Sequence, residues 1–260
     1  MPENHDHNPA RVVFLHIPKT AGTSLHLLLI DRFEENAICP IRNHKLDEMS
    51  MEQLQKYRLF SGHYYFDQVE RIPEPKILLT MLREPKARLL SLYNYHRSFR
   101  WDAIAEPEAD SGRRICLAKT LSALEYFRCA DPVVYAVVNN SMARQLIGLK
   151  YNSPDGKLRI SDDGVLNLAL KNLERFAAIG FVDSPNGSLR RFGEVLPIGL
   201  PESMPRNNTF ESLKSDSRFE QIERSIPTEA VDAELIRHTQ IDQRIYNYAL
   251  CLFKPCLPPE

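Results

Sequence analysis

The chain has 260 residues, 43% of them hydrophobic and 26% charged, which excludes a disordered or fibrous protein. Its 33 Lys and Arg against 34 Asp and Glu give a formal net charge of −1. This balance excludes the uniformly basic surface of a non-specific nucleic-acid binder, so any anion site must be local. No apolar run reaches the roughly 18 residues needed to cross a bilayer, and we expect no membrane span.

The first residues and the cysteines bear on domain organisation and compartment. Residues 1–10 lack the apolar stretch of a signal peptide, so we expect a flexible N-terminal tail and then a single domain over residues 11–260. The five cysteines are scattered and form no CxxC pair, which favours reduced thiols over a disulfide or zinc framework. We therefore expect a cytoplasmic protein without a bound metal.

Short apolar runs alternate with amphipathic segments along the chain. Such alternation predicts an α/β fold of three layers, with a central parallel sheet and helices on both faces. In chain order, the pattern predicts strands at 11–16, 58–61, 76–82 and 177–182, helices at 23–33, 85–100, 117–128, 133–149, 165–176, 188–196 and 228–253, and loops at 101–116, 152–156 and 197–213.

The loop after the first strand reads IPKTAGTS over residues 17–24. A loop that joins the first strand of such a sheet to a helix N-terminus is a common phosphate site. Gly22 lets the backbone approach an anion, Thr23 and Ser24 offer hydroxyl groups, and Lys19 supplies a mobile positive charge. The same residues also fit a capped turn with a surface lysine, and the motif alone leaves both interpretations open.

The Walker pattern GxxxxGK[ST] is absent from this loop, because the lysine precedes the glycine.

A second group of polar residues follows the strand at 76–82. Arg83 comes at the carboxyl end of that strand, and Ser91 lies about two turns into the next helix, on a face shared with Arg88 and Tyr95. A guanidinium and a hydroxyl are suited to a second phosphate, although Arg83 fits a structural ion pair equally well.

These two segments carry a family resemblance. HIPKTAGTSL resembles the 5'-phosphosulfate loop, and LREPKARLLSLYNY the 3'-phosphate motif, of sulfotransferases related to heparan sulfate 2-O-sulfotransferase and its bacterial relatives. Weaker similarity continues through NNSMARQLIG, IGFVDS, RNNTF and DQRIYNYALCLF, so the resemblance spans about residues 11–254. It implies a P-loop-like fold that transfers a sulfuryl group from 3'-phosphoadenosine 5'-phosphosulfate (PAPS) to an acceptor hydroxyl, releasing PAP.

The resemblance also implies roles for individual residues. It assigns Arg83 and Ser91 to the 3'-phosphate, and it implies no metal for the transfer. The acceptor would be a carbohydrate or glycoconjugate. The implied donor-binding residues around the 5'-phosphosulfate are Lys19, Thr20, Ala21, Gly22, Thr23 and Ser24, with Arg206, Asn208 and Thr209 in a loop that closes over the donor.

Transfer to an alcohol needs a base that takes the hydroxyl proton. His63 leaves the sheet at the same edge as Lys19 and Arg83, and SGHYYF resembles the family segment that carries the catalytic histidine. We therefore predict His63 as the general base, with Lys19 assisting at the leaving phosphate. Ser61 stands where some relatives have a second histidine. Acceptor contacts are predicted at Tyr64, Arg144 and Gln145, although Arg144 fits a buried arginine that ties helices together equally well. Tyr65, Arg97, Arg100 and Trp101 are further candidates.

Two other functions remain open at this stage. A small-molecule or sugar kinase would need a Walker lysine and a magnesium-binding acid, and we find neither motif in the sequence. A catalytically silent nucleotide-binding protein would bind PAP without turnover.

Overall fold

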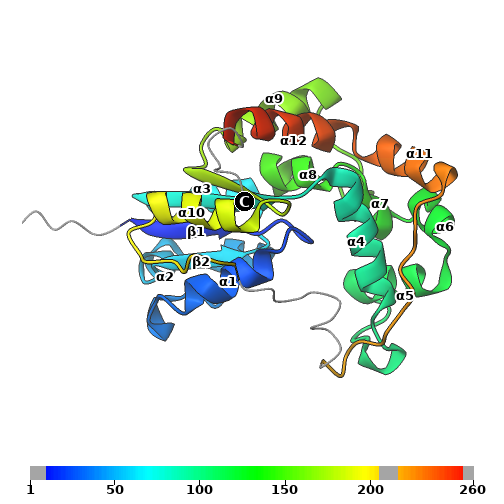
Figure 1. The fold of residues 1–260 in the computed structure, drawn as a ribbon, viewed down its shortest axis with the longest axis horizontal. Helices are drawn as coiled ribbons and strands as arrows, with labels where there is room; N and C mark the ends of the chain where they lie inside the picture. The colour runs from blue at the N-terminus through cyan, green and yellow to red at the C-terminus, as the bar shows by residue number, and fades with distance from the viewer. Residues whose placement is uncertain (1–9, 205–215, 254–260) are drawn as a thin grey trace, which may run out of the picture.

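A four-stranded, all-parallel sheet forms the centre of the structure, in the order β2-β1-β3-β4 (Figure 1). All five residues of β1 are buried, as expected for a parallel sheet covered on both faces. The computed structural model describes residues 10–204 and 216–253. The strands are β1 (Arg11–Leu15), β2 (Leu59–Gly62), β3 (Lys76–Leu82) and β4 (Ala178–Phe181).

Alternate residues of each strand point to opposite faces, and each face has its own hydrophobic core. Val13 and Leu15 belong to one core, whereas Val12 and Phe14 belong to the other. Helices contribute to both cores, which confirms the predicted three-layer α/β arrangement. The first face is covered by α2 (Met51–Gln55), α3 (Phe66–Arg71), α8 (Ser141–Ile147), α9 (Asp162–Leu173) and α12 (Gln240–Phe253), and the second by α1 (Gly22–Ile30) and α10 (Pro185–Val195).

A third core holds together a group of helices beside the sheet (Figure 1). Its centre is aromatic, because Tyr93, Tyr126 and Phe127 contact one another there. No helix in the described part of the chain is both long and apolar enough to cross a membrane. The group comprises α4 (Pro85–Arg97), α5 (Asp110–Thr120), α6 (Ala123–Arg128), α7 (Pro132–Val138) and α11 (Glu229–His238), while 3₁₀ turns lie at Glu35–Ala37, His44–Glu48, Trp101–Ala103 and Leu149–Tyr151.

All four predicted strands are confirmed, but several predictions about the helical part are wrong. The alternation of strands and helices stops after β3, because six helices, α4 to α9, precede β4. The predicted loop at 101–116 contains a 3₁₀ turn and the start of α5. Asp110 lies in the first turn of α5, where a carboxylate is favourable, and Ala118 packs into the third core. Tertiary packing thus stabilises a helix in a segment whose composition is typical of a loop.

The predicted helices at 133–149 and 228–253 are each two helices. Asn140 has a left-handed backbone (φ 44°) that separates α7 from α8. Its side-chain oxygen accepts hydrogen bonds from the backbone N–H groups of Ile241 and Asp242, at 2.9 and 3.2 Å, where α12 begins. Asn140 therefore ends one helix and caps another, and asparagine tolerates that conformation.

The predicted tail at residues 1–10 lies outside the described residues except for Ala10. The predicted loop at 197–213 is described only as far as residue 204, and it has no helix or strand there.

Candidate functional site

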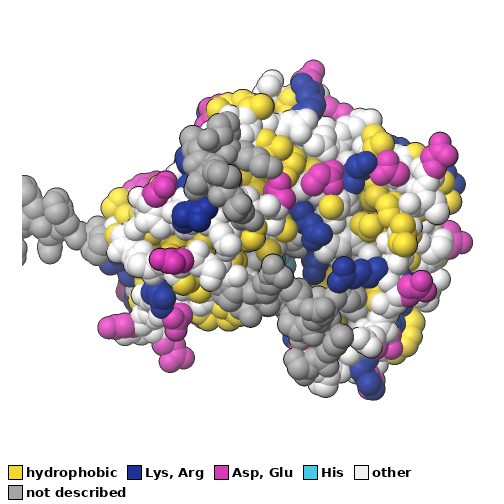
Figure 2. Space-filling view, viewed as in Figure 1, with side chains coloured by type: hydrophobic (Ala, Val, Ile, Leu, Met, Phe, Trp, Pro, Cys, Tyr) yellow, Lys and Arg dark blue, Asp and Glu magenta, His cyan; other side chains and the backbone are white. Residues whose placement is uncertain are grey.

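A pocket of about 510 Å³ lies at the carboxyl edge of the sheet, where β1, β2 and β3 end. Residues that follow these strands, among them His16, His63 and Arg83, form one wall, and helix α4 forms another. Figure 2 shows Lys and Arg side chains beside a hollow near the centre of this face of the molecule. The position matches the rule that ligands of open α/β sheets bind beyond the carboxyl ends of the strands.

The pocket is cationic. Of the described residues that line it, five carry a cationic side chain and none carries a carboxylate. Arg88 is paired with the buried carboxylate of Asp242 behind the wall, at 3.7 Å, and burial of the other cations strengthens their attraction for an anion. The five cations are Lys19, Arg83, Arg88, Arg114 and Arg144.

The loop between β1 and α1 has the backbone of an anion-binding nest. Lys19 and Ala21 have positive φ angles of 68° and 57°, whereas the φ of Thr20 between them is not positive. This alternation turns successive N–H groups toward one concave side. Within the described residues, the amides of Thr20, Ala21 and Gly22 donate to no backbone carbonyl. The loop between β1 and α1 therefore forms a concave turn, which is the geometry that the phosphate-site prediction requires.

Glycines at two positions allow the close approaches that shape the site. A Cβ at Gly22 would lie 2.2 Å from the ring of His16, so the imidazole occupies the space that a side chain would need. A Cβ at Gly62 would lie 2.5 Å from the carbonyl oxygen of Arg42. The sequence predicted that Gly22 allows an anion to approach the backbone. The structure shows that the missing side chain also leaves room for the His16 ring.

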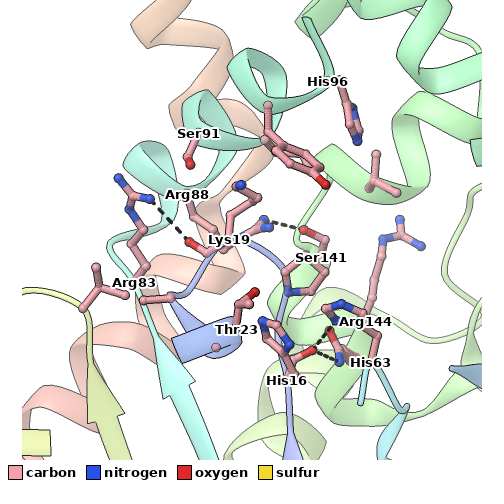
Figure 3. Close-up of a pocket in the computed structure, with 18 of the residues that line it drawn as sticks. His16, Lys19, Thr23, His63, Arg83, Arg88, Ser91, His96, Ser141 and Arg144 are labelled. Carbon is pink, nitrogen blue, oxygen red and sulfur yellow. Dashed lines mark hydrogen bonds between the residues drawn. The ribbon is translucent and has the colours of Figure 1, made fainter. Parts of the chain in front are cut away.

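Lys19 extends into the pocket (Figure 3). Its Nζ lies 3.8 Å from the centre of the Tyr95 ring. Burial, and then the charge of Arg83, lowers the pKa of Lys19 to about 8. The aromatic face partly compensates the buried ammonium. Since none of the described residues that line the pocket carries a carboxylate, the Lys19 ammonium can bind an anionic ligand.

Arg83 and Ser91 line the same pocket, as the sequence predicted (Figure 3). Arg83 Nη1 donates to the carbonyl oxygen of Lys19 at 3.4 Å, which ties the two predicted phosphate segments together. Glu84 caps α4 by accepting from the amides of Lys86 and Ala87, at 3.2 and 2.7 Å. The capped helix then presents Ser91 to the pocket.

His63 is exposed to the open pocket, and its other edge is bonded to protein. Its Nδ1 lies 2.7 Å from the carbonyl oxygen of His16. A carbonyl can only accept, so Nδ1 carries the proton and Nε2 carries the lone pair. The walls of the pocket remove part of the water around the imidazole, and this desolvation lowers the pKa of His63. The hydrogen bond to the His16 carbonyl raises this pKa, and the charge of Arg42 lowers it further. The arrangement is that of a neutral imidazole able to accept a proton at Nε2.

Arg144 and Gln145 also line the pocket, but their side chains are already engaged. The Arg144 guanidinium donates to both the carbonyl and side-chain oxygens of Asn139, to Asn152 and to the carbonyl of Gly156. The Gln145 amide donates to two backbone carbonyls. Both side chains therefore hold the wall of the pocket in place.

Some predicted residues are not brought into the pocket. Thr20 is fully buried, and its hydroxyl donates to the carbonyl of Ile17 at 2.7 Å. Tyr64 is buried in the first core, whereas Tyr65 lines the pocket. The Tyr64 hydroxyl donates to the carbonyl of Ile41 inside that core, and Tyr65, one of the further candidates, is the tyrosine of this pair that lines the pocket. Ser24, Arg97, Arg100 and Trp101 do not line the pocket either, and Arg206, Asn208 and Thr209 lie outside the described residues.

The sequence interpretation gave no role to several residues of the site. His16 was expected to be an ordinary strand residue, yet its carbonyl holds His63. Tyr95 was placed on the face of Arg88 and Ser91, and its position four residues after Ser91 was a usable signal for a pocket residue. His96, Arg114 and Ser141 are further polar lining residues that had no predicted role.

Buried neutral histidines make the site sensitive to acid. Burial, first of all, lowers the pKa of His16 well below its usual value and that of His96 to about 3. The unfolded chain takes up these protons below about pH 6.5 and the folded chain does not, so stability falls as the pH falls. Between pH 7.5 and 5.5 the free energy of unfolding should drop by about 3 kcal/mol from these two groups, roughly 1.4 kcal/mol for each.

Urea unfolding of the wild type and of His96→Gln at the two pH values checks this expectation. The variant should lose about 1.4 kcal/mol less than the wild type, because the contribution of His96 is gone. Equal losses in the two proteins would show that His96 is not a buried neutral group.

Part of the chain is similar to a known protein family. Residues 6–115 match the model of a family described as Sulfotransferase family. That segment contains β1 to β3, the loop at 17–24, His63, and the motif of Arg83 and Ser91. A crystal structure of mouse sulfotransferase SULT7A1 complexed with PAP superimposes with a TM-score of 0.42 and 14% identity, over 95% of this chain and 86% of that one. No curated protein sequence matches.

Proposed function

We propose that the protein is a PAPS-dependent O-sulfotransferase. The observation that carries the proposal is one pocket in which the described residues supply a nest-like loop, five cations, no carboxylate, and a histidine with its lone pair on Nε2. The family match over residues 6–115 supports the same reaction class. The closer relationship to heparan sulfate 2-O-sulfotransferase and its bacterial relatives, and a cytoplasmic location, are part of the proposal and rest on the sequence.

The donor would bind across the two phosphate segments. The amides of the 19–23 loop and the Lys19 ammonium would hold the 5'-phosphosulfate, and Arg83 with Ser91 would hold the 3'-phosphate. The contact of Arg83 with the Lys19 carbonyl fixes the spacing between the two groups. A nucleotide with phosphates at both ends of the ribose fits such a spacing, whereas a nucleoside triphosphate would leave Arg83 and Ser91 without a ligand.

The reaction follows from these positions. His63 Nε2 would take the proton of the acceptor hydroxyl while the hydroxyl oxygen forms a bond to sulfur. The bond between sulfur and the 5'-phosphate oxygen breaks, and the electron pair remains on that oxygen. Lys19 and the loop amides would stabilise the charge that develops there. The products are the sulfated acceptor, PAP and a proton held by His63.

The acceptor would approach through a second pocket of about 630 Å³ that shares the residues Tyr65, Arg114, Ala136 and Arg144 with the first. Tyr65 offers an aromatic ring on which a sugar ring can stack. A hydroxyl of a carbohydrate or glycoconjugate is the acceptor that we propose.

Two alternatives give different expectations. A kinase would need an acidic residue for magnesium, and no carboxylate is found among the described residues that line the pocket. A silent protein would bind PAP without turnover, and it would have no use for a histidine that keeps its Nε2 lone pair at the pocket.

The protonation of Lys19 should control donor binding. A pKa of about 8 means that the ammonium of the free enzyme is charged below that pH and neutral above it. The affinity for PAP should therefore fall by up to about tenfold per pH unit above pH 8. Calorimetric titration from pH 7 to 10 measures this slope. In Lys19→Arg the affinity should vary little over this range, because a guanidinium stays charged. An identical slope in this variant would assign the titration to another group.

Calorimetry with PAP, AMP and ATP at pH 7.5 tests the proposed donor directly. PAP should bind more tightly than AMP, which lacks the 3'-phosphate, and more tightly than ATP. ATP that binds as tightly as PAP would overturn the assignment of the second phosphate segment and favour the kinase.

A further inference from the structure

Gln145 bridges the two chain segments that meet at His63. It lies in α8 and is buried, at 6% exposure. Its Nε2 donates to the carbonyl oxygen of His16 at 3.0 Å and to that of Tyr64 at 2.9 Å. Both partners can only accept, so chemistry fixes the orientation of the amide and uses both of its N–H groups. No other residue type of this size supplies two such donors from one atom without a charge.

The carbonyl of His16 is the same group that holds His63. It accepts from His63 Nδ1 at 2.7 Å and from Gln145 Nε2 at 3.0 Å, which occupies both lone pairs of the oxygen. Tyr64, the second partner of Gln145, directly follows His63 in the chain. Gln145 thus fixes the His16 carbonyl, to which His63 donates. Through the Tyr64 carbonyl it also fixes the backbone next to the imidazole.

Helix α8 is itself firmly held. The carboxylate of Asp242, which is fully buried, accepts from the amides of Met142 and Ala143 at 3.1 and 2.8 Å. The buried Arg88 lies 3.7 Å from this carboxylate and donates to the Ser141 hydroxyl. The first turn of α8 is therefore fixed from α4 and α12, and Gln145 follows one turn later. Because α8 is held in this way, the Gln145 amide has a fixed position. Its two hydrogen bonds therefore determine where the backbone around His63 lies.

We propose that Gln145 is a positioning residue that holds His63 with its proton on Nδ1 and its lone pair on Nε2. The inference rests on the proposed role of His63 as general base, and it assigns to Gln145 a role other than contact with the acceptor. Its effect on the reaction passes through the His16 carbonyl.

The test compares Gln145→Met with a matched control, Asn172→Leu. Methionine keeps the length of glutamine and has no N–H donor. Asn172 Nδ2 donates to the carbonyl of Leu146 at 2.8 Å. The control therefore removes a buried side-chain hydrogen bond to the same helix, but not one to the His16 or Tyr64 carbonyl. Two-bond ¹H–¹⁵N spectra of ¹⁵N-histidine protein with PAP report the tautomer of His63, and His63→Gln identifies its signals. Turnover is measured with PAPS and the acceptor found by screening, and PAP affinity by calorimetry.

In the wild type and Asn172→Leu, His63 should be the Nδ1–H tautomer, with similar turnover. In Gln145→Met, the Nε2–H form should appear and kcat should fall by about 10- to 100-fold, the usual effect of misplacing a catalytic group by about 1 Å. PAP affinity should change less than about threefold, as expected for a residue that does not bind the donor. An unchanged tautomer, or a kcat equal to that of the control, would overturn the inference. If Gln145→Met does not fold, Gln145→Glu is measured by the same criteria.

The same experiment separates this inference from the proposed function. If His63→Gln itself keeps normal turnover, the assignment of the base fails. If His63→Gln is inactive while Gln145→Met is normal, the base stands and only the role of Gln145 fails.

Discussion

Replacing His63 by glutamine is expected to lower kcat by about 100- to 10,000-fold, the range for loss of a positioned general base. The proton on Nδ1 is fixed by the His16 carbonyl, and glutamine has no basic nitrogen in place of Nε2. The affinity for PAP should stay the same, because the base acts on the acceptor. Since burial lowers the pKa of His63, kcat of the wild type should rise through an apparent pKa below the usual 6.5. This rising limb should be absent from the variant.

The matched control is His44→Gln, an exposed histidine in a 3₁₀ turn that does not line the pocket. Its kcat should equal that of the wild type. Near-normal turnover of His63→Gln, with the rising limb kept, would place the base elsewhere. Glu84 is then a poor substitute, because its carboxylate is occupied by the two amides that it caps.

Replacing Arg83 by alanine is expected to weaken PAP binding by about 10- to 150-fold, equivalent to the roughly 1.5 to 3 kcal/mol of a charge-assisted hydrogen bond. If Arg83 binds the 3'-phosphate, the affinity for AMP should change little, because AMP lacks that group. The preference for PAP over AMP should therefore nearly disappear in the variant. Calorimetry with both nucleotides measures this difference.

Arg83 also contacts the Lys19 carbonyl, which provides a competing explanation for weak binding. If its role is only to hold the loop, PAP and AMP should lose affinity equally, and that result would contradict a 3'-phosphate contact. The control is Arg175→Ala, which removes an exposed arginine that is paired with Glu70 and does not line the pocket. It should leave both affinities unchanged.

The sequence was sufficient to predict the sheet and the edge at which the pocket lies. Buried parallel strands are recognisable from short apolar runs, and the carboxyl ends of such strands must share one edge, so Lys19, His63 and Arg83 were expected to lie together. The face of α4 that bears Ser91 and Tyr95 followed from helical periodicity. These predictions succeeded because they depend on local pattern and on sheet topology alone.

Other features depend on contacts between distant segments and could not be predicted in this way. The break at Asn140 is stabilised by the start of α12, a hundred residues later in the chain. The bonds from Gln145 to the His16 and Tyr64 carbonyls likewise join three separate segments. Thr20 was predicted to contact the PAPS donor because of its place in the motif. Its hydroxyl instead donates to the carbonyl of Ile17 within the loop.

The measurement that tests the proposed function most directly compares two labelled donors on the same panel of hydroxyl acceptors, in EDTA and in magnesium. The panel contains neutral oligosaccharides, uronate-containing oligosaccharides and simple phenols. With ³⁵S-labelled PAPS, label should appear on an acceptor, with an equal amount of PAP released, and transfer should survive EDTA because Lys19 and the loop amides stabilise the leaving phosphate. Transfer of ³²P from ATP in magnesium, without transfer of ³⁵S, would contradict the proposed function and identify a kinase.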